Sequence, residues 1–592
     1  MKDFGKMILA VVCGLIIVTI LKYVILILFM AGMSAAGNGG KAIPREGVLD
    51  LNLSELVIME QSTEMAMPGL SGGFSMDVTP VGLREAVKTL ETAAADPGIH
   101  YVLLRPDGVS AGMADLEELR RALKEFRRSG KAVVAYLENP GNGSYYLATA
   151  ADKIYMSSVK GGTYQLIGLS GRMIFLKDVL DKLGVNVQLI RHGKYKSAGE
   201  MFIRSNSSAE NREQNQVMIN TAWRNLSAEI TASREISPAD FNKLIDNLSL
   251  CFPEDFLKAG LVDELMDHES LLEKLRTLAQ VQPGGKLNLI PFADYLQAHK
   301  DLGLPGRNNV AIIYADGDIV EGKGYEGIAG DRFVKIIDDV RTDVTVKAVV
   351  LRVNSPGGSV SASAKIRAAL DLLQEEKPLV ASYGNYAASG GYWISNGCQK
   401  IYSDANTVTG SIGVFSMLPE FSKVTRKLGV TVESVGSNKH SDMFTLMRPF
   451  DATETAYMQA SVEDIYETFV NLVADGRGLE AARVDQIAQG RVWMGSDALD
   501  ISLVDEIGTL EDAIVYAAGL AGLHNSEDYR VLSFPKPLTM MEQFMMALGQ
   551  KMEEPYVLSG TPFESMGKAV ETLTDSKPSA VYARMPYDLQ IQ

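Results

Sequence analysis

Three segments in the first half of the chain recur, in the same order, in the second half, and this internal repeat limits the folds that the chain can adopt. The stretch VLLRPDGVSAGMADLEELRRAL from Val102 matches VVLRVNSPGGSVSASAKIRAAL from Val349. KAVVAYLENPGNGSYYLATAADKIYM from Lys131 matches KPLVASYGNYAASGGYWISNGCQKIYS from Lys377, and the motif KLGV occurs once in each half. Because the matched segments keep the same order and nearly the same spacing, we interpret the chain as a tandem duplication.

Each matched segment predicts a strand, a loop and a helix. A short β-branched run comes first, and apolar residues at helical spacing follow the loop. Strands that alternate with helices indicate an α/β fold with mainly parallel strands covered by helices. We therefore predict an N-terminal segment 1–33, a linker 34–46, a first repeat domain 47–301, a second repeat domain 308–534 and a C-terminal extension 535–592.

The N-terminal segment is apolar over a length that suits a membrane span. Ile8 to Met33 is almost wholly apolar, and about 20 such residues cross the hydrocarbon core. Lys2 and Lys6 precede it, which favours a cytoplasmic N-terminus with the rest of the chain on the outer side. The alternative is a cleaved signal peptide with the small residues 34–36 at the cleavage site.

Charge and cysteine content exclude several functions. The chain has 57 Lys and Arg against 73 Asp and Glu, a net charge of −16, and it lacks the basic stripe that a nucleic-acid partner requires. Its 3 Cys form no CxxC motif and its 6 His are scattered, so neither a disulfide framework nor a zinc site is predicted. We predict no cofactor and no metal, although a carboxylate site for a hard cation stays open.

The two repeats differ at two positions that suit hydrolytic chemistry. Alignment of the second segment places Ser389 opposite Asn142, and alignment of the third places Lys196 opposite Ser441. The second repeat therefore has a serine where the first has an asparagine, and the first repeat has a lysine where the second has a serine. A hydrolytic site assembled from both halves needs one of each.

Ser389 follows a buried-strand pattern and precedes a helical one, so it is expected on a turn. Small neighbours allow close approach of a substrate backbone. The Gly357-Gly358 pair follows another strand, and backbone N–H groups of Gly358 and Gly390, with Gly357 as a possible supporting donor, could stabilise an oxyanion. The alternatives are a helix N-cap for Ser389 and a simple tight turn for the glycine pair.

A serine hydroxyl needs a base, and Lys196 becomes one if burial lowers its pKa towards neutrality. Lys194 lies two residues away and shares a face with Lys196 if the segment is extended, which would raise the local positive potential. The alternative is that Lys196 is a solvated surface charge, as most lysines are.

Four stretches in this order resemble the signal peptide peptidase A (protease IV) family in its long, two-repeat, membrane-anchored form. The stretches are YKSA at 195–198, NSPGGS at 354–359, AASGGYW at 387–393 and TGSIGV at 409–414. The resemblance implies a Clp-protease/crotonase-like α/β fold and a Ser/Lys-dyad endopeptidase. Ser389 would be the nucleophile, Lys196 the general base, and Ser411 a residue that orients the lysine or lines the site.

The resemblance also implies a homotetramer on the outer face of the bacterial cytoplasmic membrane. Signal peptides released in the membrane and other unfolded apolar peptides would be its substrates. Two other functions stay open. A crotonase-like acyl-CoA enzyme would need a basic CoA patch and a carboxylate, neither of which lies near the glycine loops. A non-catalytic membrane scaffold would need neither Ser389 nor Lys196.

Overall fold

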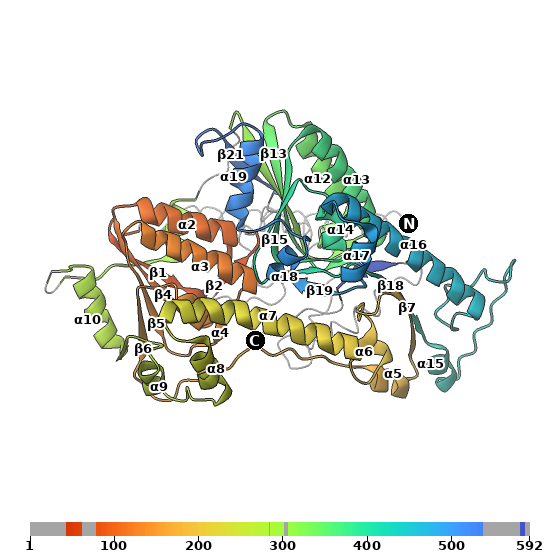
Figure 1. Cartoon of the computed structure of the whole chain (residues 1–592), viewed down its shortest axis with the longest axis horizontal. Helices are drawn as coiled ribbons and strands as arrows, with labels where there is room; N and C mark the ends of the chain where they lie inside the picture. Colours follow the sequence, from red (N-terminus) through yellow and green to blue (C-terminus); the bar gives the residue numbers. More distant parts are fainter. Residues whose placement is uncertain (1–42, 62–77, 283–284, 301–305, 537–580, 586–592) are drawn as a thin grey trace, which may run out of the picture.

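A computed structural model describes residues 43–61, 78–282, 285–300, 306–536 and 581–585 (Figure 1). The predicted N-terminal segment 1–33 lies outside these residues, as do most of the linker and most of the C-terminal extension. Within the described ranges, no helix is both long enough and apolar enough to cross a membrane.

The first half is built on a six-stranded parallel sheet in the order β8-β6-β5-β4-β1-β9. Its strands are β1 (Gly47–Asn52), β4 (Ile99–Arg105), β5 (Val133–Leu137), β6 (Lys153–Ser157), β8 (Glu264–Met266) and β9 (Leu289–Pro291). A separate parallel pair, β2 (Leu56–Met59) and β3 (Thr79–Gly82), follows the 3₁₀ turn Leu53–Glu55.

The second half is built on an eight-stranded sheet, parallel except where β17 meets β19. Its strands are β10 (Asn309–Asp316), β13 (Val346–Ser355), β15 (Leu379–Ala388), β16 (Lys400–Ser403), β17 (Val408–Gly410), β19 (Val492–Met494), β20 (Glu506–Ile507) and β21 (Arg530–Phe534). The run β21-β10-β13-β15-β16-β20 repeats the order β9-β1-β4-β5-β6-β8 of the first half. The α/β repeat predicted from the sequence is therefore present in the fold.

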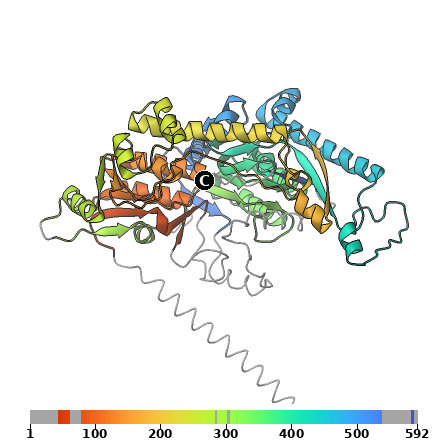
Figure 2. The same ribbon diagram turned by 90° about the horizontal axis from the view of Figure 1, so that it is seen from below.

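Helices cover both sheets (Figure 1). Those of the first half are α2 (Leu83–Ala95), α3 (Met113–Arg128), α4 (Asn142–Ala148), α5 (Lys177–Leu183), α6 (Glu200–Ile203), α7 (Ala209–Arg234), α8 (Pro238–Asp246), α9 (Pro253–Lys258), α10 (His268–Leu278) and α11 (Phe292–Ala298). Those of the second half are α12 (Gly330–Thr342), α13 (Val360–Glu376), α14 (Gly390–Ser395), α15 (Ser422–Lys427), α16 (Ala452–Arg477), α17 (Ala481–Ile487), α18 (Gly495–Asp500) and α19 (Leu510–Leu520). The long α7 runs along one side of the molecule and contacts α4 of its own half and β19 of the other (Figures 1 and 2).

The central strands are apolar on both faces because both faces are covered, as is usual for parallel sheets. In β13, Val349 and Leu351 pack into the core that includes residues of α12 and α13. Ala348 and Val350 point the other way and pack with residues of α19. The continuous apolar run VVL in the sequence reflects this two-sided burial.

A third sheet joins the two halves, in the order β12-β11-β14-β22-β18-β7. Its strands are β7 (Asn186–His192), β11 (Ile319–Val320), β12 (Ile328–Ala329), β14 (Gly357–Ser359), β18 (Val414–Glu420) and β22 (Tyr582–Arg584). β7 belongs to the first half and pairs antiparallel with β18 of the second over seven residue pairs, from Val414 with His192 to Glu420 with Asn186. This pairing fixes where the chain after β7 lies relative to the second half.

A buried ion cluster also holds the halves together. Arg352 on β13 is fully buried, and it forms ion pairs of 2.8 Å with Glu60 and with Glu118 of the first half. Its guanidinium also donates to Ser382 Oγ at 2.9 Å and to the carbonyl of Tyr383 at 3.0 Å. Attraction by the two carboxylates raises the pKa of Arg352 against the opposing effect of burial.

Replacement of Arg352 by methionine should destabilise the protein by about 3–5 kcal/mol, because it leaves two buried carboxylates without their cation. The shift of the urea unfolding midpoint measures this loss. Arg341→Met is a suitable control because Arg341 pairs with Asp338 at the surface, and it should unfold at the wild-type urea concentration. A wild-type midpoint for Arg352→Met would show that the cluster contributes nothing to the contact between the halves.

Candidate active site

Ser389 lies on the turn between β15 and α14 and has an unusual backbone conformation. Its φ is 55° and its ψ is −111°, a region that residues with a Cβ rarely adopt and that is common at functional sites. The N–H of Ser389 donates to the carbonyl of Gly410 at 2.8 Å. Its side chain makes no capping hydrogen bond to α14, so the N-cap alternative does not account for this serine.

Lys196 reaches Ser389 from the other half of the chain. β7 runs beside β18, and the following turn places the N–H of Tyr195 2.9 Å from the carbonyl of Gln489. The Nζ of Lys196 then lies 2.9 Å from the Oγ of Ser389. The two residues that the repeats do not share are therefore in hydrogen-bond contact, although 193 positions separate them.

The amine of Lys196 is enclosed and surrounded by neutral oxygen atoms. Its Nζ also contacts Ser411, at 3.1 Å from Oγ and 3.2 Å from the carbonyl. The side chain is 0 % exposed, and its desolvation lowers the pKa of Lys196 well below the usual 10.5. The alternative that Lys196 is a solvated surface charge is wrong, and the uncharged amine is favoured in this environment.

Two glycines of the second half allow the lysine to come this close. A Cβ on Gly490 would lie 2.6 Å from the Cα of Lys196, and a Cβ on Gly413 would lie 3.2 Å from its Cδ. Gly490 also has a φ of 78°, which favours glycine. No sequence motif around Gly490 predicts this role, because the role depends on a contact with the other half.

The glycine pair at 357–358 forms part of strand β14 and not the simple tight turn that was one of the alternatives. A Cβ on Gly357 would lie 2.6 Å from the backbone N of Gly390. The glycine strand therefore passes directly against the start of α14, next to Ser389. The N–H of Gly357 donates to Ser355 Oγ at 3.2 Å, whereas Gly358 pairs with Ala583 of β22.

Lys194 does not share the buried face with Lys196. Residues 193–199 form turns instead of a strand, so the premise that residues two apart lie on the same side is wrong here. Lys194 is exposed, and its Nζ lies 5.1 Å from the centre of the Tyr195 ring. Lys194 therefore lies outside the enclosed site that holds the amine of Lys196.

The counterparts of Ser389 and Lys196 have structural contacts in their own halves. Asn142 is buried at the start of α4, where its amide donates to the carbonyl of Gly168 at 2.9 Å. The Oγ of Ser441 donates to the carbonyl of Asn438 at 3.0 Å in an exposed loop. Within the described residues, the pair of Ser389 and Lys196 therefore forms once, at the contact between the two halves.

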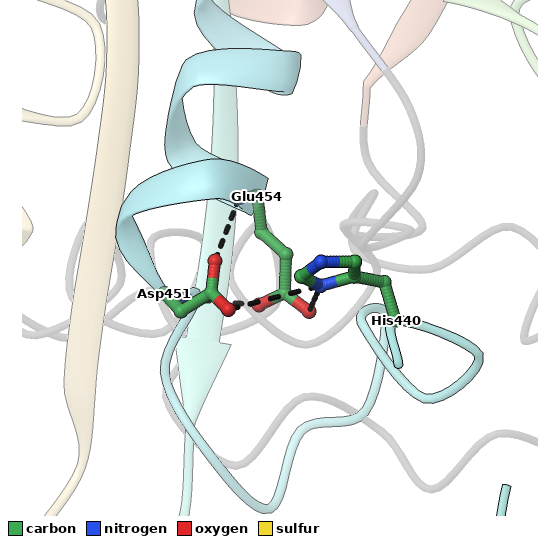
Figure 3. Close-up of side chains that lie close together, drawn as sticks. All are labelled: His440, Asp451 and Glu454. Carbon is green, nitrogen blue, oxygen red and sulfur yellow. Dashed lines mark hydrogen bonds and ion pairs between the residues drawn. The ribbon is translucent and has the colours of Figure 1, made fainter. Parts of the chain in front are cut away.

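His440, Asp451 and Glu454 lie close together and test whether the carboxylate cation site left open by the sequence exists here (Figure 3). Both oxygens of Glu454 accept hydrogen bonds of 2.7 Å from Arg448, and this arginine lowers the pKa of Glu454 to about 2. Asp451 caps α16 through the N–H of Glu454 at 2.8 Å. Arginine pairing and helix capping therefore explain the cluster without a cation.

Comparison with known proteins places the chain in a family. The profile of peptidase family S49 matches it twice, over residues 125–282 and 371–524. The chain belongs to peptidase family S49. Lys196 lies in the first S49 match and Ser389 in the second, so the family domain is present twice and the predicted duplication and family are confirmed.

Two relatives illustrate the extent of the similarity. Protease 4 of Haemophilus influenzae is 34% identical over 538 residues, which cover 87% of this chain and 86% of the relative. The serine protease SPPA, chloroplastic, of Arabidopsis thaliana is 31% identical and covers 77% of this chain and 68% of the relative. These S49 relatives support a protease over the acyl-CoA enzyme.

Among solved structures, a ClpP1 mutant from Listeria monocytogenes matches 34% of this chain and 94% of its own, at a TM-score of 0.24 and 14% identity. A TM-score this low carries no argument about the fold. The mixed α/β architecture of the S49 repeats is observed, and the Clp-protease/crotonase-like class stays a prediction.

Proposed function

We propose that the chain is a serine endopeptidase in which Ser389 is the nucleophile and Lys196 is the general base. One observation supports this most strongly: a fully buried amine lies 2.9 Å from the hydroxyl of a serine with a strained backbone. Desolvation favours the uncharged form of the amine, which is the form that can accept a proton from a serine.

The proposed reaction begins with Lys196. Its neutral Nζ takes the proton of Ser389 Oγ, and this oxygen attacks the carbonyl carbon of the scissile peptide bond. Contacts of Nζ with Ser411 orient the amine towards Ser389. Backbone N–H groups of Gly358 and Gly390 stabilise the oxyanion. Lys196 then protonates the leaving amine, and water, activated by the same lysine, hydrolyses the acyl-enzyme and regenerates Ser389.

The surroundings of the site favour apolar, extended substrates. Ala388, next to the nucleophile, belongs to a buried cluster with Val408, Val492 and Met494, which supplies no charge for a charged side chain. Released signal peptides and other unfolded apolar peptides fit this chemistry. We include in the proposal the features implied by the family resemblance: a membrane anchor, an outer-face location at the cytoplasmic membrane, and a homotetramer.

The pH dependence of peptide hydrolysis tests the proposal. Because the base must be uncharged, kcat/KM for an apolar peptide should fall about tenfold for each pH unit below the lowered pKa of Lys196. The rate should rise with pH and level off well below 10.5, the usual lysine value. A rate that is constant from acid to alkaline pH would contradict the lysine role.

The same assay separates the other candidate functions. A non-catalytic scaffold predicts no hydrolysis at any pH, and an acyl-CoA enzyme predicts turnover of CoA thioesters without cleavage of peptides. Peptide cleavage with the predicted pH profile would exclude both.

A further inference from the structure

One polar side chain of α7 is buried where the two halves meet. Gln214, Met218 and Ala222 are spaced four residues apart, so they lie on one face of the helix. Met218 and Ala222 pack into the apolar cluster that includes Ala388 and Val492 of the second half. Gln214 continues this face and is only 1 % exposed. A buried amide is costly unless hydrogen bonds replace those it made to water, so packing alone does not explain a glutamine here.

The amide nitrogen of Gln214 holds the turn that carries Lys196. Its Nε2 donates to the carbonyl of Tyr195 and to the Oγ of Ser197, both at 3.0 Å. These two residues flank the lysine on either side. The N–H of Ser197 also donates to the carbonyl of Tyr195 at 2.7 Å. The amide therefore binds both ends of a tight turn with Lys196 at its centre, which we call the lysine turn.

The amide oxygen of Gln214 faces the strands that hold the proposed nucleophile. It accepts the N–H of Val492 on β19 at 3.4 Å. Val492 lies opposite Gly410 in the pairing of β19 with β17. The carbonyl of Gly410 in turn accepts the N–H of Ser389 at 2.8 Å. One side chain therefore connects the lysine turn with the pair of strands that fixes the backbone of the serine.

We propose that Gln214 is a positioning residue that keeps the amine of Lys196 within hydrogen-bond distance of Ser389 by linking the lysine turn to β19. This inference rests on the proposed function, because it takes Lys196 as the base. Gln214 acts on the backbone around Lys196 and not on the reacting atoms. A side-chain amide suits the role because it carries two donors and an acceptor at one end.

The full chain with Gln214→Met tests the proposal. Methionine retains apolar packing between α7 and the second half but removes the donors and the acceptor. Misplacement of a reacting group by about 1 Å can cost about 10²-fold in rate. With a fluorogenic apolar peptide, we therefore expect kcat per folded molecule to fall at least about tenfold, with KM within about twofold of wild type because the groove itself is unchanged.

The pH profile of kcat separates positioning from stability. An amine released from its enclosed place is better hydrated, so the profile of Gln214→Met should shift to higher pH. Neighbouring charges are retained in this variant: Arg191 pairs with the buried Glu200 at 3.2 Å, and Arg491 pairs with Glu213 at 3.4 Å. A residue that contributed only stability would lower Tm and leave both kcat per folded molecule and its pH profile unchanged.

Gln214→Asn is a second test variant that keeps the polarity of the site. It retains the amide but shortens the side chain by one methylene, so the amide cannot reach the lysine turn and β19 together. It should also lower kcat several-fold and shift the profile upward, even if Gln214→Met fails to fold. Wild-type kcat and a wild-type pH profile in either folded variant would overturn the proposal and leave Gln214 a structural residue.

Asn225→Leu is the matched control for the docking of α7. The Nδ2 of Asn225 donates to the carbonyl of Ala405 at 3.2 Å and to Ser496 Oγ at 3.0 Å, so this variant also removes polar contacts between α7 and the second half. It should lower Tm and keep the wild-type kcat and pH profile. The same fall in kcat as in Gln214→Met would overturn the proposal, because docking of the whole helix would then control the base.

Ser389→Ala in the same assay distinguishes failure of this inference from failure of the proposed function. If Ser389→Ala is inactive and Gln214→Met matches the wild type, the positioning role alone is refuted. If Ser389→Ala hydrolyses the peptide as the wild type does, the proposed function is refuted, and the positioning of a base by Gln214 fails with it.

Discussion

The Ser389→Ala chain should lose peptide hydrolysis by at least about 10⁴-fold in kcat, as expected when the nucleophile of a covalent mechanism is removed. The oxygen that contacts Lys196 at 2.9 Å is the atom deleted, and the glycine strand and α14 remain in place. Initial rates with a fluorogenic apolar peptide measure the loss. Circular dichroism of the same sample shows whether the fold is retained.

Ser403→Ala provides the matched control for this substitution. Ser403 is also 0 % exposed, but its Oγ donates to the carbonyl of Asp404 at 2.9 Å and not to the lysine. This variant should keep wild-type kcat. If Ser389→Ala retained more than a tenth of the wild-type rate, Ser389 would not be the nucleophile.

Lys196→Met should abolish activity and stabilise the protein. Loss of the base should lower kcat by about 10³-fold or more. In the unfolded chain Lys196 is protonated at neutral pH, whereas burial lowers its pKa in the folded protein. Each unit of that lowering costs about 1.4 kcal/mol of folding free energy below the folded pKa. Methionine has a similar size and no charge to desolvate.

The sign of this effect can be checked against pH. The unfolded state binds the Lys196 proton more tightly, so wild-type stability should rise as pH increases from the lowered folded pKa towards 10.5. Lys196→Met should lack this rise, so its advantage in Tm should shrink over the same pH range. Lys194→Met removes an exposed charge two residues away, and both its activity and its Tm should match the wild type. A lower Tm for Lys196→Met at neutral pH would indicate that Lys196 is charged and paired in the folded protein.

Local sequence patterns were sufficient to predict the α/β architecture and the turn that carries Ser389. Runs such as VVL before a loop, followed by helical spacing, predict β13 and α13, and the small residues around Ser389 predict the turn between β15 and α14. These features depend on residues that are neighbours in sequence. The repeat then indicated which positions had diverged, and so identified Ser389 and Lys196 as candidates without any knowledge of their contact.

Contacts between distant segments could not be predicted in the same way. Lys194 and Lys196 are chemically identical in the sequence, yet one is exposed and the other is enclosed. The difference arises because the segment turns after β7 and packs against Gln489 and Gly490. Likewise, nothing within NSPGGS reveals that Gly358 pairs with Ala583, 225 positions later in the chain.

The amino-acid sequence by itself determined the doubled α/β plan, the strand-to-helix position of Ser389 and the S49 family motifs, because each is written in short-range periodicity and residue type. Only the tertiary structure decided that Lys196 is enclosed beside Ser389, that Arg352 joins the halves, and that β22 pairs between β14 and β18. The physical reason is that desolvation, ion pairing and strand addition depend on which distant surfaces meet, and the pairing of β7 with β18 brings those surfaces together.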